Sequence, residues 1–240
     1  MNETPMTIPA RILSVPHQPA RALHRRARKM LARLGVSEQG LAFIEFGLIL
    51  PLFLLLCFGG LELANYALSR MAVSKIAVNL ADSASRLGEG NPLAGKQINE
   101  AMLNDVLEGA IAQGASQDFQ NRSRIILSSL QVNAQGGQWI AWQRCIGGKT
   151  GYQSTLGREG DGASGTAFGG MGTGTTQIRA AQGYAVMVAQ IQYQYKPVIG
   201  FWSALSDANI LSYTSAFPVR ENRDLTRVYP AAGEVSRTCS

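Results

Sequence analysis

The sequence predicts an α+β fold in which a long N-terminal helix, half membrane-spanning and half amphipathic, packs on a small antiparallel sheet. Two observations predict the helix: an apolar run over residues 41–61 and, directly after it, apolar residues that recur at helical spacing. The sheet is predicted because four later segments alternate apolar and polar residues. The 240 residues suffice for one ordinary core besides the apolar run.

Residues 1–40 form a basic leader. Seven Lys and Arg residues and two acidic residues precede residue 41, so most of the formal net charge of +6 lies there. Because basic residues beside a first membrane segment favour the cytoplasm, the leader is predicted to be cytoplasmic. Nucleic-acid binding is disfavoured, since no aromatic platform or folded context accompanies these charges. Met30 is an alternative start to Met1.

Residues 41–61 are predicted to be a transmembrane helix, because about 20 residues at about 1.5 Å rise span a hydrocarbon core of about 30 Å. The only charge in this run is Glu45. A carboxylate there costs about 2.5–3.5 kcal/mol on insertion scales, so Glu45 needs a partner or a function. The alternative is that it lies in the headgroup zone, where the helix dipole favours it. Pro51 predicts a kink or a freed backbone carbonyl.

The same helix is predicted to continue past residue 61 and to end before Gly88, Gly90 and Pro92. Asp82 and Arg86 lie four residues apart on its polar face. A second amphipathic helix is predicted over residues 93–113, with Glu100 away from its apolar side and Gly114 as its end. The apolar face of the first helix contains Tyr66, Val73, Ile76, Ala77, Leu80, Ala84 and Leu87.

The four predicted strands cover residues 124–133, 138–145, 183–195 and 211–219, and residues 134–137 predict a hairpin between the first two. In the third strand, Gln190 and Gln192 face away from Met187, Ile191 and Tyr193. A mobile glycine-rich loop is predicted over residues 147–174. Residues 62–240 are therefore expected to form one extracytoplasmic α+β domain.

Candidate catalytic motifs are lacking. The string of residues 147–150 resembles part of a phosphate-binding loop, but Gln143 stands where that loop requires its first glycine. Both histidines lie in the leader, which excludes histidine-based triads and metal sites in the rest of the chain. The sequence predicts a protein that is not an enzyme and that holds no cofactor and no metal.

The three cysteines differ in their predicted surroundings. Cys57 lies in the apolar run, whereas Cys145 and Cys239 lie on the predicted outer side. In an oxidising compartment the latter two are the natural disulfide pair, and closing so long a loop contributes about 4–5 kcal/mol in the chain-entropy model. Two free thiols are the alternative.

Residues 35–62 resemble the N-terminus of TadE-like proteins of the tight-adherence (Tad/Flp) pilus, which are pseudopilins of the type IV pilin superfamily. The resemblance rests on a basic leader, Gly40, Glu45 followed by aromatic Phe46, a proline-containing apolar run and a glutamate after it. Weaker similarity extends to residues 142–148, residues 192–201 and Cys239. The departures are Phe46, where many members have tyrosine, and a long leader.

The resemblance implies a pilin-like fold and a minor pseudopilin that supports pilus assembly and adhesion. A prepilin peptidase would cut between Gly40 and Leu41. The implied partners are membrane lipid, other pilus or pseudopilin subunits, and Tad assembly components of the bacterial inner membrane. The chain would cross that membrane once, with its C-terminal domain in the periplasm or at the cell surface. Its size argues against a major pilin, which is little more than the processed helix.

Cleavage would also give Glu45 a partner. A cut after Gly40 creates an α-ammonium at Leu41, and a carboxylate four residues later lies one helical turn away. The pair can form within one chain or between neighbouring subunits, where it would set the axial register of a filament. The alternative function is a single-pass anchor that carries a periplasmic binding or sensing domain unrelated to pili.

Overall fold

The computed structural model describes residue 29 and residues 38–90, 95–199 and 210–239. Nearly all of the predicted leader, including Met30, lies outside these residues. The described residues divide into two units, a first unit that ends at Cys57 and a second unit that begins at Phe58.

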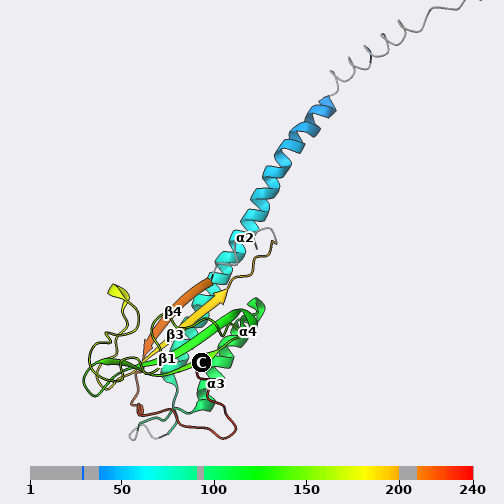
Figure 1. The fold of residues 1–240 in the computed structure, drawn as a ribbon. Helices are drawn as coiled ribbons and strands as arrows, with labels where there is room; N and C mark the ends of the chain where they lie inside the picture. The colour runs from blue at the N-terminus through cyan, green and yellow to red at the C-terminus, as the bar shows by residue number, and fades with distance from the viewer. Residues whose placement is uncertain (1–28, 30–37, 91–94, 200–209, 240) are drawn as a thin grey trace, which may run out of the picture. The chain divides into compact units, whose positions relative to one another are not determined.

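The longest element is helix α2, Glu38–Arg86, with 49 residues and Pro51 inside it (Figure 1). Among the described residues it is the one helix that is long and apolar enough to cross a membrane. Most large apolar side chains of the first unit are exposed on this helix; Leu41 and Leu56, for example, are each 64% exposed. The predicted apolar helix is therefore confirmed, and it is suited to single-pass anchoring.

The second unit contains a four-stranded antiparallel sheet in the order β2-β1-β3-β4. The strands are β1 (Ser123–Val132), β2 (Gln138–Ile146), β3 (Val186–Gln194) and β4 (Ile210–Pro218). The hairpin between β1 and β2 is as predicted, and its register shifts between Ser129 and Leu130. Alternation therefore located all four strands, with the largest difference at the start of β3.

Helix α3, Glu100–Gln113, starts later than predicted. The Asn99 side chain caps it by accepting a hydrogen bond from the backbone N–H of Met102 at 2.9 Å. The residues just before it pair instead with the C-terminal segment, through the bridges Lys96 to Arg223 and Asn99 to Tyr229. Short helical turns follow at η1 (Ala115–Gln117), α4 (Phe119–Arg122) and η2 (Gly174–Thr176).

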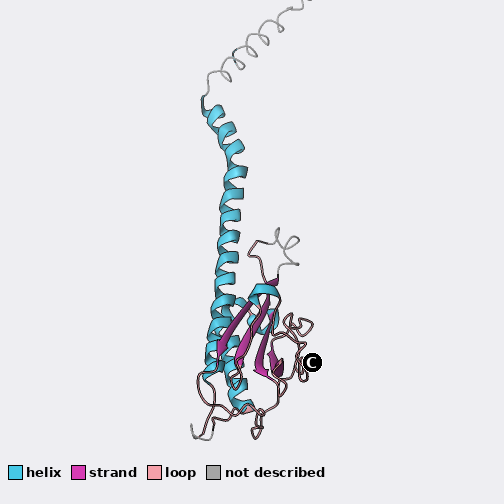
Figure 2. Cartoon of the chain, turned by 90° about the vertical axis from the view of Figure 1, so that its left-hand side faces the viewer, coloured by secondary structure: helices cyan, strands magenta, loops and turns pink. Residues whose placement is uncertain are grey.

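One face of the sheet packs against the C-terminal part of α2 and against α3 (Figure 2). The apolar face predicted for α2 forms this core, with Tyr66 and Leu87 partly buried at its margin. On its opposite side, Arg86 and Asp82 form the expected pair at 3.0 Å. The buried core includes Val73, Ile76, Ala77, Leu80 and Ala84 from α2, Leu103 and Leu107 from α3, and Ile125, Leu127, Met187, Ile191 and Tyr193 from the sheet.

The glycine-rich loop of residues 147–174, which was predicted to be mobile, covers the other face of the sheet. The Asn133 side chain donates to the carbonyls of Gly162 and Gly165 at 2.8 and 2.7 Å. Gln190 donates to the Thr155 hydroxyl at 2.6 Å and is only 2% exposed. A second, smaller core cluster lies under this loop and contains Leu130, Ile140 and Met171. The polar face of β3 is therefore buried and satisfied by the loop.

The C-terminal end of α2 is held by an arginine that follows β4. The Arg223 guanidinium donates to the carbonyls of Ala84, Ser85 and Leu87, which lie at the end of the helix. Burial lowers the pKa of Arg223 to about 10, so the group stays charged at neutral pH. A cation at this position donates hydrogen bonds to carbonyls that have no partner within the helix, and it interacts favourably with the negative end of the helix dipole.

Candidate functional site

The residues predicted for processing and assembly lie together at the start of α2, in the first unit. Gly40 and Leu41 are both helical and exposed, so the predicted scissile bond lies within the first turn of the helix. Glu45 and Phe46 follow one turn later, and both are also exposed. Among the described residues, the Glu45 carboxylate has no hydrogen bond or ion pair. It is therefore accessible to a partner outside its own fold.

In the second unit, the carboxylate of Glu62 marks the point where the apolar run ends. Glu62 is only 8% exposed and is the first residue of the buried face of α2. Its Oε1 accepts a hydrogen bond from the Tyr195 hydroxyl at 2.6 Å. Its Oε2 accepts from the backbone N–H groups of Val198 and Ile199 at 3.0 and 3.2 Å. This carboxylate thus binds the residues that follow β3.

Tyr195 is held by three groups of α2. Besides its bond to Glu62, its hydroxyl accepts a hydrogen bond from the Asn65 side chain at 2.7 Å. The Tyr66 ring meets the Tyr195 ring edge-on at 5.2 Å between centroids. Burial, and then the hydrogen bond to Glu62, raise the pKa of Tyr195 to about 12. The phenol is therefore neutral at physiological pH and acts as a donor.

Glu62 has no predicted role of its own. In the sequence it is noted only as the glutamate after the apolar run, within the resemblance to a known family. The available signal was the spacing from Glu62 to Tyr66 and Val73, which places the carboxylate on the apolar face of α2. A charge at that position needs a buried partner. The partner itself lies 133 residues away, and no local pattern identifies it.

The disulfide between Cys145 and Cys239 is confirmed, with the two Cα atoms 5.0 Å apart. It joins β2 to the C-terminal segment, and the Cys145 N–H also donates to the Arg237 carbonyl at 2.7 Å. The Asn104 side chain of α3 donates to the Val235 carbonyl at 3.1 Å. Cys57 is a free, exposed thiol on α2.

Glu100 is buried, although its helical position predicted a polar face. The Arg144 guanidinium binds it with Nε at 3.0 Å from Oε2 and Nη2 at 2.6 Å from Oε1. Burial alone would raise the pKa of Glu100, but the hydrogen bonds and charge of Arg144 outweigh burial and hold it below its usual value. This pair fixes the start of α3 against β2, next to the disulfide.

No group of three His, Cys, Asp or Glu side chains lies close enough to hold a metal ion within the part of the chain that the structure describes. Each unit instead has one carboxylate of note: the first unit has an exposed one near the start of α2, and the second has a buried one directly after the apolar run. The first is available to another molecule, and the second is fully engaged within the fold.

The model of a family described as TadE-like protein matches residues 40–81. The match covers less than a fifth of the chain, from Gly40 through the apolar run to Ala81. It confirms the resemblance inferred for the N-terminal segment, whereas residues 142–148 and 192–201 lie outside it. No curated protein and no solved structure is significantly similar to the chain.

Proposed function

We propose that this chain is a membrane-anchored minor pseudopilin of the Tad/Flp pilus system that supports pilus assembly and adhesion. The observation that carries the proposal is the TadE-like match, which begins at Gly40, the residue after which the sequence predicts cleavage. The exposed apolar run of α2 supports membrane anchoring. In this proposal a prepilin peptidase removes residues 1–40, and the role of the mature chain is structural rather than enzymatic.

Processing at this position would create a positive charge that can pair with the Glu45 carboxylate. After the cut, the α-ammonium of Leu41 and the Glu45 carboxylate are one helical turn apart, about 6 Å along the axis. A chain can satisfy this pair itself or share it with a neighbouring subunit. In hydrocarbon an unpaired charge is costly, so a shared pair would favour one axial register between subunits.

The topology follows from the charges around α2. The basic leader would keep the N-terminus in the cytoplasm and place residues 62–240 in the periplasm or at the cell surface. The disulfide supports this orientation, since structural disulfides persist in oxidising compartments. Partners would be other pilus subunits, inner-membrane Tad components, the peptidase and lipid.

The direct test is the N-terminus of the mature protein. The full chain is expressed in cells with and without an active prepilin peptidase, extracted in detergent, and analysed by intact mass and N-terminal sequencing. We expect Leu41 as the first residue only when the peptidase is active. Retention of residues 1–40 in peptidase-active cells would contradict processing and favour a membrane-anchored binding or sensing domain.

Paired glycine variants make the test specific. Gly40→Leu should block the cut, because the peptidase would have to accept a bulky side chain at the scissile bond. Gly47→Leu is the matched control, since a Cβ at Gly47 meets no atom within 4 Å. The control should be processed like the unaltered chain. Equal processing of both variants would show that Gly40 is not recognised.

A further inference from the structure

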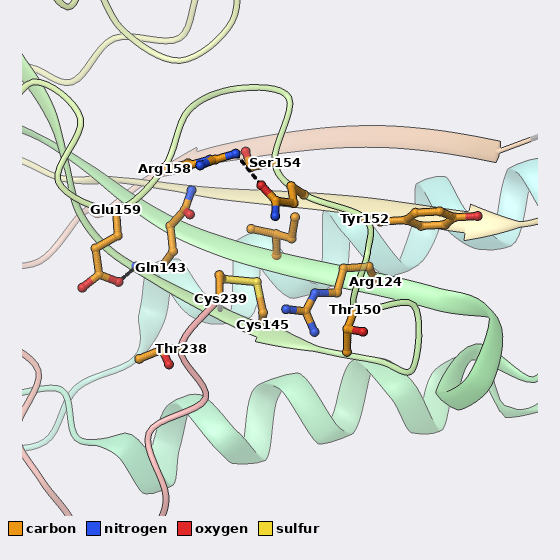
Figure 3. A pocket seen from close by; sticks show the side chains of 12 residues that line it. Arg124, Gln143, Cys145, Thr150, Tyr152, Ser154, Arg158, Glu159, Thr238 and Cys239 are labelled. Atoms are coloured by element: carbon orange, nitrogen blue, oxygen red, sulfur yellow. Dashed lines mark hydrogen bonds between the residues drawn. A yellow bond between two sulfur atoms is a disulfide. The ribbon is translucent and has the colours of Figure 1, made fainter.

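A cavity of about 480 Å³ lies on the loop-covered face of the sheet, beside the disulfide (Figure 3). Its floor is formed by Arg124 of β1 and Gln143 of β2, and the C-terminal segment closes one side at Cys239. The glycine-rich loop supplies the remaining wall, from Thr150 to Glu159. A volume of this size is typical of small-molecule sites.

Arg124 is the unusual residue of this cavity. It is only 7% exposed, and within the described part of the chain its guanidinium makes one hydrogen bond, a long contact of 3.5 Å from Nη1 to the Gly147 carbonyl. Its Nε is buried with no partner, and no carboxylate pairs with it among the described residues. Burial lowers the pKa of Arg124.

Neighbouring arginines show the contrast. Arg122 donates to the carbonyls of Gln194 and Tyr195 at 3.0 and 3.1 Å. Arg144 binds Glu100 through two nitrogens. A buried guanidinium without comparable partners is costly, so Arg124 is the group for which a bound anion would contribute most.

The other charges of the cavity limit the kind of anion. Arg158 lies at the exposed rim, and the hydroxyl-bearing residues Thr150 and Ser154 line the same wall (Figure 3). Glu159 also lines the cavity, but its carboxylate accepts from the Gln143 N–H at 2.8 Å and lies 3.5 Å from Arg144. With two cations and one acid, the lining carries a net charge of one positive unit, which a single negative charge on the ligand balances.

We propose that this cavity binds a carboxylate group, which pairs with Arg124 on its floor and is accompanied by Arg158 at its rim. A guanidinium and a carboxylate are both planar and can form two parallel hydrogen bonds. The carboxylate comes either from a free small organic acid or from an acidic side chain of a partner protein. The site is separate from the processing segment and does not depend on the proposed function.

The test uses the full chain in detergent micelles and saturation-transfer NMR at constant ionic strength. Acetate and benzoate are the probes, and benzamide is the neutral control of matched shape. We expect saturable binding of the acids and none of benzamide. Absence of saturable binding for both acids overturns the proposal. Inorganic phosphate that binds more tightly than benzoate overturns the assignment to a carboxylate.

Variants locate the binding. Arg124→Gln should weaken benzoate binding about 10-fold or more, as expected when a charged hydrogen-bonding partner is lost. Arg179→Gln, an exposed arginine outside the cavity, is the matched control and should bind as before. Ser154→Trp fills the cavity without altering Arg124 and should also abolish binding. Intact mass under non-reducing conditions reports whether each variant retains the disulfide, and unchanged binding in both cavity variants overturns the proposal.

Crosslinking in cells distinguishes the two sources of the carboxylate, a free organic acid and a partner protein. A photo-crosslinking residue replaces Thr238, which is an exposed residue of the cavity lining. A crosslink to another protein that is lost in Arg124→Gln supports an acidic side chain of a partner. Binding of benzoate in vitro without such a crosslink supports a free organic acid. A crosslink that persists in Arg124→Gln contradicts recognition of a partner through this arginine.

Discussion

The Glu62 carboxylate accepts a hydrogen bond from the Tyr195 hydroxyl at 2.6 Å, although the two residues lie 133 positions apart. Glu62 follows the apolar run directly, and Tyr195 follows the last residue of β3. The bond therefore attaches the sheet to the first turn of α2 outside that run. Two backbone N–H groups, of Val198 and Ile199, share the same carboxylate.

Glu62→Ala should lower the free energy of unfolding by about 2–3 kcal/mol, because a buried hydroxyl and two N–H groups lose their acceptor. Chemical denaturation of the full chain in detergent, followed by fluorescence, measures this change. Glu89→Ala removes an exposed carboxylate and should change stability by less than about 0.5 kcal/mol. Equal stability of the two variants would show that Glu62 is not a structural attachment.

The raised pKa of Tyr195 predicts a loss of stability at alkaline pH. The folded value is about 12, and an exposed tyrosine has about 10. The contribution is therefore complete below about pH 10 and is lost as the pH rises towards 12, by about 2–3 kcal/mol in total. Stability curves of the unaltered chain and Tyr195→Phe should converge over this range. Parallel curves would contradict the assignment.

Arg144→Met should destabilise the fold by about 3–5 kcal/mol at neutral pH, because it leaves the Glu100 carboxylate buried without its cation. The lowered pKa of Glu100 means that its pair stabilises the fold above the unfolded value, near 4.5, and that this contribution is lost as the pH falls through the folded value.

Urea denaturation at pH 7 and at acidic pH measures both effects of Arg144→Met. Its cost should shrink on acidification, since a protonated Glu100 needs no cation. Asp82→Asn breaks the exposed pair with Arg86 and is the matched control, with an expected cost below about 1 kcal/mol. A cost for Arg144→Met that is independent of pH would refute the ionic explanation.

Cys239→Ser should cost about 4–5 kcal/mol in the chain-entropy model, because the bond closes a loop with a sequence separation of 94. Limited proteolysis should then cut the segment around Arg237, which the bond holds against β2. Cys57→Ser leaves the disulfide intact and should match the unaltered chain. Resistance of Cys239→Ser to proteolysis would mean that the hydrogen bonds of this segment suffice to hold it.

Glu45→Ala should leave cleavage after Gly40 largely intact and impair pilus assembly, because only the pairing of the new α-ammonium is lost. Intact mass reports cleavage, and electron microscopy of the cells reports piliation. Glu89→Ala again serves as the control for a carboxylate outside the segment. Normal piliation of Glu45→Ala cells would rule out the pairing.

Local patterns predicted most of the fold. Alternation located β1 to β4, since each strand buries one face in the core and its side chains repeat every two residues. Helical spacing identified the buried face of α2 from Val73 to Ala84 for the equivalent reason. The disulfide followed from compartment alone, because Cys145 and Cys239 were the two cysteines predicted outside the membrane.

Long-range pairings account for what the sequence did not reveal. Glu100 has a polar side chain on an amphipathic helix, and only Arg144, 44 residues later, explains its burial. Gln190 has the alternation of an exposed strand face, yet a loop with few apolar residues covers it through hydrogen bonds. The helix predicted from residue 93 begins at Glu100 because the preceding residues pair with the C-terminal segment.

Two of the polar attachments of α2, at Glu62 and at Arg223, have a mechanical consequence. Glu62 binds the end of β3 and Arg223 binds the last turn, so the helix is fastened at points roughly 36 Å apart along its axis. Traction along α2 would load both attachments and the apolar contacts between them in shear. Under such loading, contacts along this length must yield together, whereas a helix fastened at one end would peel away turn by turn.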